Sequence, residues 1–518
     1  MSVITPELLR SIPSNASFYD EKHDRHFEVH AQDGKLYQSE FQTGSDQQEI
    51  FRDTRQLDWI LGAGANGMGG LVQKEGFLFQ APMSFYSKPQ TWGLSPGYEF
   101  GDYGFNRPIL AGCIFCHSGR SRPIAATNGR YEEAPFAEMA VGCENCHGPG
   151  AAHRTAVLAG ANRSNGKDLH IVNPSHLSPV LTNNLCMSCH QTGDVRVLRP
   201  GKTYQDFRPG QPLDDTLSIL MEPPTRESPP QNDHLEHYYS MTLSKCYRSS
   251  GGRMSCISCH DPHIEPSPEA APAFFAQRCR ACHDEKSCRL PLESRHQTNP
   301  PDNCIACHMP KRDVRVISHS TITNHRILAR PDEPFPDITF SQTTPSLPDL
   351  LHLNPGPGQK DSLPLLTLLQ AYGQMAETRP QYTERYFTVL DQIEHTEPNN
   401  SLVQAALGRR DLKKGKFQAG LEHLQRSLRI GPPQANVYGD LAEALSQLGR
   451  IDESIAALRS GVALDPFNPV LQKTLVLRLI QAKQHPEAKV ALQHYVEAFP
   501  QDSFMRHMLE LANGGTAK

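Results

Sequence analysis

The first hundred residues have the pattern of a β-rich region. Apolar and polar residues are interspersed through two short runs, 27–32 and 35–41, which flank Asp33-Gly34, a dipeptide typical of a two-residue hairpin turn. Residues 76–80, Gly-Phe-Leu-Phe-Gln, form another strand-like run. We therefore expect residues 1–110 to form a β-rich N-terminal region.

One glycine-rich segment of this region matches a nucleotide-binding pattern by its letters alone. Gly62-Ala-Gly64-Ala-Asn-Gly67 has the spacing GxGxxG. A dinucleotide site also needs a helix directly after the glycines and an acidic residue about 20 positions later. A strand-like run follows instead, and Ser87-Lys-Pro-Gln90 stands where the acidic residue would be. We predict a loop here and no nucleotide site.

The C-terminal part has a helical, repetitive pattern. Proline recurs there at intervals of 34 residues, which is the tetratricopeptide period. We number the positions of each repeat from residues 401, 435 and 469. A small residue at the eighth position would let the two helices of a repeat approach, and a leucine at the twenty-fourth would fill the seam to the next repeat. The prolines are Pro398, Pro432, Pro466 and Pro500, the eighth position holds Gly408, Ala442 and Val476, and the twenty-fourth holds Leu424, Leu458 and Leu492.

We therefore expect residues 363–518 to form an α-solenoid of four repeats. The first would be a divergent copy at 367–400, and a capping helix would cover 503–513. The concave surface of such a solenoid is expected to dock a protein partner, and a spacer or stabilising role is the alternative. Upstream, residues 331–362 contain seven prolines and are predicted to be an extended linker.

Composition excludes some classes of protein. The 518-residue chain has a net charge of −5, which does not suggest a general binder of nucleic acid or anionic membranes. It contains no run of 18 apolar residues, so no ordinary membrane-spanning helix is expected. Cysteine is the informative residue, because twelve of the 14 cysteines belong to one repeated motif.

The motif Cys-x-x-Cys-His occurs six times and is the attachment signature of c-type haem. Two thiols three residues apart lie on one side of a helical turn and can add to the two vinyl groups of a porphyrin edge, while the adjacent imidazole binds iron as the proximal ligand. Zinc knuckles and a disulfide framework are alternatives, but neither explains a histidine after every pair. The anchoring cysteines are Cys113, Cys116, Cys143, Cys146, Cys186, Cys189, Cys256, Cys259, Cys279, Cys282, Cys304 and Cys307, and the proximal histidines are His117, His147, His190, His260, His283 and His308.

The six motifs are crowded. From Cys113 to His308 the chain has 196 residues, or about 33 for each motif, whereas chains below roughly 40 residues rarely build a core of their own. Six covalently attached haems would therefore pack against one another, and residues 111–330 are expected to be irregular or helical with little regular structure. Closely packed haems exchange electrons, so the spacing predicts an electron conduit.

Each iron also needs a sixth ligand or an open face. Residues 1–330 hold twelve histidines outside the motifs, and six would complete bis-histidine ligation. Some of these follow a motif closely or lie beyond the last motif, and we expect those to be distal ligands. They are His153, His263, His319 and His325, with His237 as a further candidate and one of His23, His26 and His30, represented by His26, as a weaker one.

Three strings of sequence resemble a known family. They are Gly142-Cys143-Glu-Asn-Cys146-His147-Gly-Pro-Gly-Ala-Ala-His153, Gly251-Gly-Arg-Met-Ser-Cys256-Ile-Ser-Cys259-His260-Asp-Pro-His263 and Asn303-Cys304-Ile-Ala-Cys307-His308-Met309-Pro310. They resemble bacterial multihaem c-type cytochromes, whose haem region is similar to the tetrahaem electron carriers of nitrifying bacteria and whose members end in tetratricopeptide repeats. The likeness of the haem part covers roughly residues 18–330.

The resemblance implies low-potential electron transfer outside the cytoplasm, and redox proteins as partners. By matching position it supports five of the distal candidates, His153, His237, His263, His319 and His325. It also implies a disulfide between Cys246 and Cys288 around the fourth and fifth sites, with two free thiols as the alternative. Relatives often carry one further Cys-x-x-Cys-His near the N-terminus, which this chain lacks.

The expected compartment conflicts with the start of the sequence. Haem c is attached outside the cytoplasmic membrane, so we expect a periplasmic or cell-surface protein. The opening residues show no basic stretch followed by 7–15 apolar residues, as a signal peptide would. A misassigned start codon or a removed N-terminus would explain the difference.

The favoured interpretation is thus a non-catalytic electron-transfer protein that docks to its partner through the repeats. A multihaem oxidoreductase that acts on a small nitrogen or sulfur compound at a five-coordinate haem is one alternative. The other is a homo-oligomer or filament in which haems run between subunits. Optical spectra with added iron ligands separate the first two interpretations.

Overall fold

A computed structural model describes residues 1–160, 170–230, 236–313, 321–343, 347, 349–356 and 363–514. Its contacts group the chain into two compact units. Unit 1 combines residues 1–140 with residues 379–518, and unit 2 consists of residues 141–378. The β-rich start and the helical end of the chain therefore belong to the same unit, and in the sequence the segment with five of the six motifs separates them.

Unit 1 begins with two antiparallel sheets, which confirms the predicted β-rich region. Apolar side chains from both sheets, among them Phe27, Leu36, Met83 and Phe85, form one buried cluster. The four-stranded sheet has the order β2 (Asn15–Asp20), β3 (Arg25–Gln32), β4 (Lys35–Thr43) and β5 (Glu49–Gln56). The larger sheet has the order β1 (Ser2–Val3), β6 (Trp59–Leu61), β7 (Gly67–Lys74), β8 (Phe77–Tyr86) and β10 (Arg107–Pro108), with β9 (Thr91–Leu94) also paired to β8.

Two turns of these sheets agree with the sequence predictions. Strands β3 and β4 form a hairpin in which Gln32 pairs with Lys35, and Asp33 and Gly34 both have positive φ, at 50° and 73°, as a two-residue turn of this kind requires. The GxGxxG segment is the loop between β6 and β7, which pair antiparallel. A Cβ atom on Gly62 would lie 2.5 Å from the carbonyl oxygen of Gly67, so the tight loop explains the glycine without a nucleotide.

The first motif and a small hairpin complete the N-terminal part of unit 1. The motif ends helix α2 (Ala111–His117), and β11 (Arg120–Pro123) pairs with β12 (Tyr131–Glu138). A short helix, α1 (Pro6–Ser11), precedes the sheets and is capped by the Thr5 side chain. Motif 1 thus lies in unit 1, and the other five motifs lie in unit 2.

The C-terminal helices follow the predicted repeat. Helices α13, α15 and α17 begin at residues 401, 435 and 469, the positions at which the frame started, and the predicted capping helix is present. A Cβ atom on Gly408 would lie 2.5 Å from Cγ of Leu424, so the eighth and twenty-fourth positions of this repeat meet closely. The helices are α12 (Thr383–Ile393), α13 (Ser401–Lys413), α14 (Phe417–Ile430), α15 (Ala435–Gln447), α16 (Ile451–Leu464), α17 (Pro469–Gln481), α18 (His485–Ala498) and α19 (Ser503–Ala512).

The repeats pack on the larger sheet through the turns that join one repeat to the next. Phe467, in the turn between α16 and α17, places its ring edge-on to Phe77 and Phe79, at centroid distances of 5.7 and 5.0 Å. Nζ of Lys74 lies 4.4 Å from the Phe467 ring, and the Asn106 side chain donates a 2.7 Å hydrogen bond to the carbonyl of Ala498. The repeats therefore form part of a larger unit and do not stand alone.

Unit 2 has one small region with its own apolar core. Strand β14 (Leu217–Met221) pairs antiparallel with β13 (Val195–Leu198) on one side and β17 (Leu351–His352) on the other. Leu213, Ile219, Tyr239 and other buried side chains form the core of this region. The remaining elements are α3 (Cys143–His147), α4 (Ala151–Leu158), α5 (Pro179–His190), α6 (His237–Thr242), α7 (Lys245–Ser249), α8 (Ala271–Arg280), α9 (Leu292–His296), α10 (Cys304–His308) and α11 (Leu365–Thr378), and the strand pair β15 (Lys311–Asp313) and β16 (Thr321–Thr323).

Part of the segment predicted as a linker is integrated into unit 2. The Asn354 side chain accepts a hydrogen bond from the Ile219 N–H and donates one to the Leu217 carbonyl, so it imitates a strand partner of β14. His352 is buried, and its Nε2 lies 3.0 Å from the buried Asp214 carboxylate. These polar contacts fix the chain beside β14 although the surrounding sequence is rich in proline.

The stretches around the motifs of unit 2 contain almost no apolar core. Among the described residues between Leu243 and Leu328, Ala276 is the single buried apolar side chain, and between Val141 and Met187 there is none. By contrast, the sheets and the repeats each bury a cluster of large apolar side chains. The motif stretches therefore lack the buried apolar surface that normally holds a protein fold together.

Candidate functional site

The motifs occupy short helical turns, as their chemistry requires. Four of them end a helix with the histidine as its last residue, in α2, α3, α5 and α10. In the fourth and fifth motifs, the N–H of His260 and of His283 donates a hydrogen bond to the carbonyl of the first cysteine of the same motif. Cysteines three residues apart on one turn lie on the same side, so both thiols of a motif can reach one edge of a flat ligand.

Three motif histidines each face one of the candidate distal histidines. The ring centroids are 5.9 Å apart for His147 and His263, 5.3 Å for His190 and His237, and 6.1 Å for His260 and His325. One iron between two imidazoles needs two metal–nitrogen bonds of about 2 Å. With roughly 1 Å from each nitrogen to its ring centre, the centroids would be about 6 Å apart, so each pair has the spacing of two axial ligands of one iron.

Several of these imidazoles are oriented by backbone carbonyls. Nδ1 donates to a carbonyl oxygen in His147, at 2.7 Å from Val172, in His308, at 2.5 Å from Leu328, and in His325, at 3.0 Å from Thr323. Such a bond fixes the proton on Nδ1 and leaves Nε2 free to bind a metal. The ring of His237 differs, because among the described residues its buried Nδ1 has no hydrogen-bond partner.

Burial favours the neutral imidazole in His190, His237, His260 and His325. Desolvation lowers the pKa of His190 and His260, and it lowers that of His237 to about 3 and that of His325 to about 4, with a smaller contribution from neighbouring histidines. Desolvation also lowers the pKa of His117 in unit 1. A neutral imidazole is the form that binds a metal, so the electrostatics of the site agree with metal ligation.

The thiols of successive motifs in unit 2 lie close enough to influence one another. Burial, together with the thiols of the third motif, raises the pKa of Cys146, and Cys186 of the third motif forms a hydrogen bond with Cys256 of the fourth. That bond raises the pKa of Cys186 and lowers that of Cys256. Burial and the thiols of the fifth motif raise the pKa of Cys259, and burial and Cys304 of the sixth motif raise that of Cys279. Motifs two to six are therefore neighbours in the order in which they occur in the chain.

Other candidate ligands lie outside the three pairs. His153 is half-buried in the first turn of α4, and His319 falls outside the described residues. The weaker candidate His26 is stacked between Tyr19 and Phe41 on the four-stranded sheet, with Nε2 3.4 Å from the Thr43 hydroxyl. Its contacts are those of a histidine on a sheet surface.

The disulfide implied by the resemblance is not present. Cys246 and Cys288 are both free thiols in the structure. Burial raises the pKa of Cys246, and so does the nearby thiol of Cys282, while Cys246 in turn raises the pKa of Cys259. Cys246 therefore lies among the thiols of the fourth and fifth motifs, and the structure agrees with the alternative of two free thiols.

Sequence reasoning missed the groups that orient the imidazoles. The acceptors are the backbone carbonyls of Val172, Thr323 and Leu328. Because every residue type has a backbone carbonyl, the amino-acid sequence gives no sign of these contacts. It also missed Gln191, which is fully buried directly after a motif histidine and accepts a hydrogen bond from the Tyr239 N–H.

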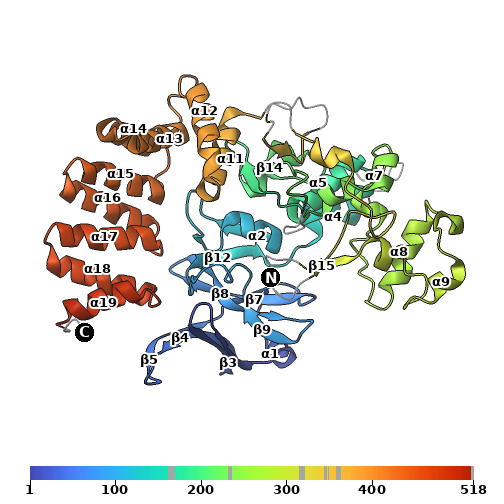
Figure 1. Cartoon of the computed structure of the whole chain (residues 1–518), viewed down its shortest axis with the longest axis horizontal. Coiled ribbons are helices and arrows are strands. Elements are labelled where there is room, and N and C mark those ends of the chain that lie inside the picture. The colour runs from blue at the N-terminus through green and yellow to red at the C-terminus, as the bar shows by residue number, and fades with distance from the viewer. Residues whose placement is uncertain are drawn as a thin grey trace. The chain divides into compact units, whose positions relative to one another are not determined.

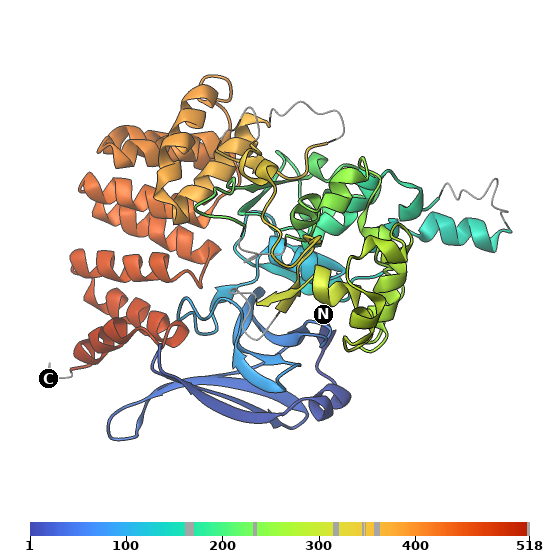
Figure 2. The same cartoon turned by 45° about the vertical axis from the view of Figure 1, so that its right-hand side comes forward.

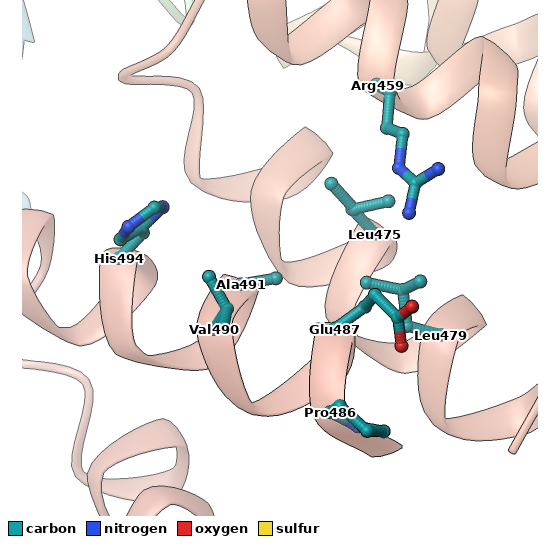
Figure 3. A pocket seen from close by; sticks show the side chains of 8 residues that line it. All are labelled: Arg459, Leu475, Leu479, Pro486, Glu487, Val490, Ala491 and His494. Atoms are coloured by element: carbon teal, nitrogen blue, oxygen red, sulfur yellow. The ribbon is translucent and has the colours of Figure 1, made fainter. Parts of the chain in front are cut away.

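Other features of the described residues concern metals, membranes and pockets. No group of three or more His, Cys, Asp or Glu side chains is arranged there to hold a bare metal ion. No helix in the described part of the chain is long and apolar enough to cross a membrane. A shallow hollow of about 420 Å³ lies on the repeats, where Leu475 and Leu479 of α17 meet Val490 of α18 between the charged Arg459 and Glu487 (Figure 3).

Comparison with known proteins identifies the helical repeats. Residues 411–477 match the family model of the tetratricopeptide repeat. These residues span α14, α15, α16 and most of α17, which stack side by side in both views (Figures 1 and 2). The C-terminal region therefore consists of tetratricopeptide repeats, as its period predicted. No curated protein matches the chain.

The solved structures that resemble the chain each cover less than a third of it. The "APC/C hetero-tetramer Cut9-Hcn1" is 18% identical over 29% of this chain and 30% of that one, with a TM-score of 0.27. YrrB, described as "a TPR protein with an unusual peptide-binding site", is 12% identical over 29% of this chain and 77% of its own, with a TM-score of 0.26. The MamA protein is 19% identical over 29% and 82%, with a TM-score of 0.26. The matched part spans less than a third of the Cut9-Hcn1 chain.

Proposed function

We propose that this chain is a multihaem c-type cytochrome that relays electrons through six covalently attached haems. The observation that carries the proposal is the set of three histidine pairs, each of which joins a motif histidine to a candidate distal histidine at the spacing of two axial ligands. When bound, haem c would supply a one-electron carrier at each motif.

The residues of the chain would have distinct roles in this function. The twelve motif cysteines would anchor the porphyrins, and the six motif histidines would bind iron from one side. His263, His237 and His325 would bind from the other side at the second, third and fourth motifs. The carbonyls of Val172, Thr323 and Leu328 hold three of these imidazoles with Nε2 free.

The nearly empty core around the motifs supports the same proposal. A stretch of more than 80 positions with Ala276 as its single buried apolar side chain among the described residues needs another source of apolar surface to fold. Porphyrin rings would supply that surface. The zinc and disulfide alternatives provide no comparable apolar area.

The neighbour relations of the thiols support a linear relay. Because the thiols of motifs two to six influence one another in chain order, the porphyrins that they anchor would also be neighbours in that order. Electrons would then pass from one end of the row to the other. We place the protein in the periplasm or at the cell surface, where haem c is attached, and expect the repeats to dock a redox protein partner.

Mass spectrometry and optical spectroscopy test this function. The full chain is produced with a signal peptide in a host that attaches haem c, and the intact mass should exceed that of the polypeptide by six haems. The oxidised and reduced spectra should be those of low-spin iron at the sites with histidine pairs. Export without any thioether-bound haem would refute the proposal.

A further inference from the structure

The three histidine pairs differ in how firmly their outer imidazole is held. His325, which pairs with His260, donates Nδ1–H to the Thr323 carbonyl at 3.0 Å. In the pair of His147 and His263, the inner imidazole donates to the Val172 carbonyl, and Nδ1 of His263 lies 3.4 Å from the Asp261 carboxylate. Only the outer imidazole of the third-motif pair, His237, has a buried Nδ1 without a partner among the described residues.

A second polar group beside the same pair is also unpartnered. Gln191 follows His190 directly and is fully buried. Its Oε1 accepts a hydrogen bond from the N–H of Tyr239, two residues after His237, but its Nε2 donor is buried without a partner. The surroundings of this pair therefore contain unsatisfied hydrogen-bonding capacity, which a small polar ligand could use.

Hydrogen bonding to Nδ1 controls how tightly a histidine binds a metal. It orients the ring and raises the basicity of Nε2, and loss of such an outer contact typically weakens metal binding by about 10- to 100-fold. An imidazole without this contact is thus the one that a competing ligand displaces first. Its ring is also crowded, because the His325 ring lies 4.2 Å away, centroid to centroid.

We infer that His237 is the exchangeable axial ligand and that the third motif is the site where a small iron ligand with a hydrogen-bond acceptor binds. This inference rests on the proposed function. In such an exchange, Nε2 of His237 would give up its bond to iron, His190 would keep its bond, and the incoming ligand would take the position that His237 held. No electron is gained or lost, and the displaced imidazole leaves the iron as a neutral group.

Carbon monoxide is a suitable probe, because it binds reduced haem iron and is measured optically. The full-length, haem-loaded protein is reduced with dithionite, and the number of carbon monoxide molecules bound per chain and the rate of binding are compared in the wild type, His237→Ala and His325→Ala. In the wild type, one site should bind slowly, because His237 must leave first. His237→Ala should leave the total unchanged and make that site bind fast.

His325→Ala is the matched control, because its imidazole is anchored. It should raise the total by one molecule per chain, since the fourth motif is firmly closed in the wild type. An equal rise of one in His237→Ala would show that His237 is held as firmly as His325 and would overturn the inference.

Two further measurements keep the outcomes apart. Added imidazole should restore the low-spin spectrum of His237→Gly, which shows that the variant is folded and that the lost ligand was the imidazole. If imidazole changes nothing in a variant with full haem content, His237 is no ligand and the inference fails. A chain without thioether-bound haem would refute the proposed function itself, and the intact mass reveals that case before any carbon monoxide is added.

Discussion

The contact between the repeats and the larger sheet leads to the first prediction, the effect of Phe467→Ala. The Phe467 ring makes two edge-on contacts, with Phe77 and Phe79, and its centre lies 4.4 Å from Nζ of Lys74. Aromatic pairs of this kind contribute about 0.5–1.5 kcal/mol each. Phenylalanine truncations in a core cost about 3–5 kcal/mol. Because Phe467 is half-buried, we expect Phe467→Ala to destabilise unit 1 by about 3 kcal/mol.

The two parts of unit 1 have separate optical probes. Both tryptophans of the chain, Trp59 and Trp92, lie in the larger sheet, whereas the far-ultraviolet circular dichroism is dominated by helices. In the wild type, tryptophan fluorescence and circular dichroism should change at one denaturant concentration. In Phe467→Ala the two transitions should separate and move to lower denaturant.

A matched control is available on the capping helix. Phe504 is 54% exposed, so Phe504→Ala should cost under about 1 kcal/mol and leave the two transitions coincident. If Phe467→Ala behaves like Phe504→Ala in the full-length, haem-loaded protein, then the aromatic contact does not couple the repeats to the sheet, and the reasoning is refuted.

Three further predictions concern packing, pH and thiols. Gly408→Val should destabilise the repeats by about 2 kcal/mol in denaturant titrations, because the new valine side chain would collide with Leu424. The control Ala456→Val, at an exposed helix position, should cost much less. Equal effects of the two variants would contradict the close approach of Gly408 to Leu424. Burial lowers the pKa of Lys74 to about 7 in the folded protein. Above that pH the unfolded chain therefore binds more protons than the folded one, so the free energy of unfolding of unit 1 should rise between pH 7 and 10. Lys74→Met should flatten this rise when unfolding is measured against pH, and an unchanged slope would exclude Lys74 as its source. Since Cys246 and Cys288 are free, alkylation of the denatured, haem-loaded protein without reductant should label two thiols per chain, and no labelling would restore the disulfide.

Local and periodic signals accounted for the parts of the fold that could be predicted. The Asp33-Gly34 turn fixes its hairpin through backbone angles that few residues tolerate. The repeats can be recognised in the sequence by their fixed period, since each repeat buries the same positions against its neighbour. Both features depend on residues close together in the chain.

Long-range contacts could not be predicted in the same way. The strand β17 pairs with β14 because the Asn354 side chain and the His352–Asp214 contact replace the usual alternation of apolar residues, and a proline-rich sequence gives no sign of this. Nothing in the sequence indicated that Phe467 would meet Phe77, almost 400 positions earlier. The expected linker was inferred from composition alone.

The candidate site shows the same division. The motifs identify the inner histidines. Closeness to a motif suggested His263 as a partner, and a position beyond the last motif suggested His325. Which outer histidine faces which inner one depends on how distant segments fold together, so the pairs emerge only in three dimensions. The difference between His237 and His325 depends on one backbone carbonyl.

The insertion of unit 2 into the sequence of unit 1 affects how the protein folds during synthesis. The N-terminal sheets are synthesised first, but Phe77 and Phe79 of the larger sheet are covered only after Phe467 has been synthesised. At a ribosomal speed of about 5–20 residues per second, the delay is on the order of 20–80 s. During that time the nascent chain exposes an apolar surface. A chaperone that binds this surface, or export of the chain in the unfolded state, would have to prevent aggregation.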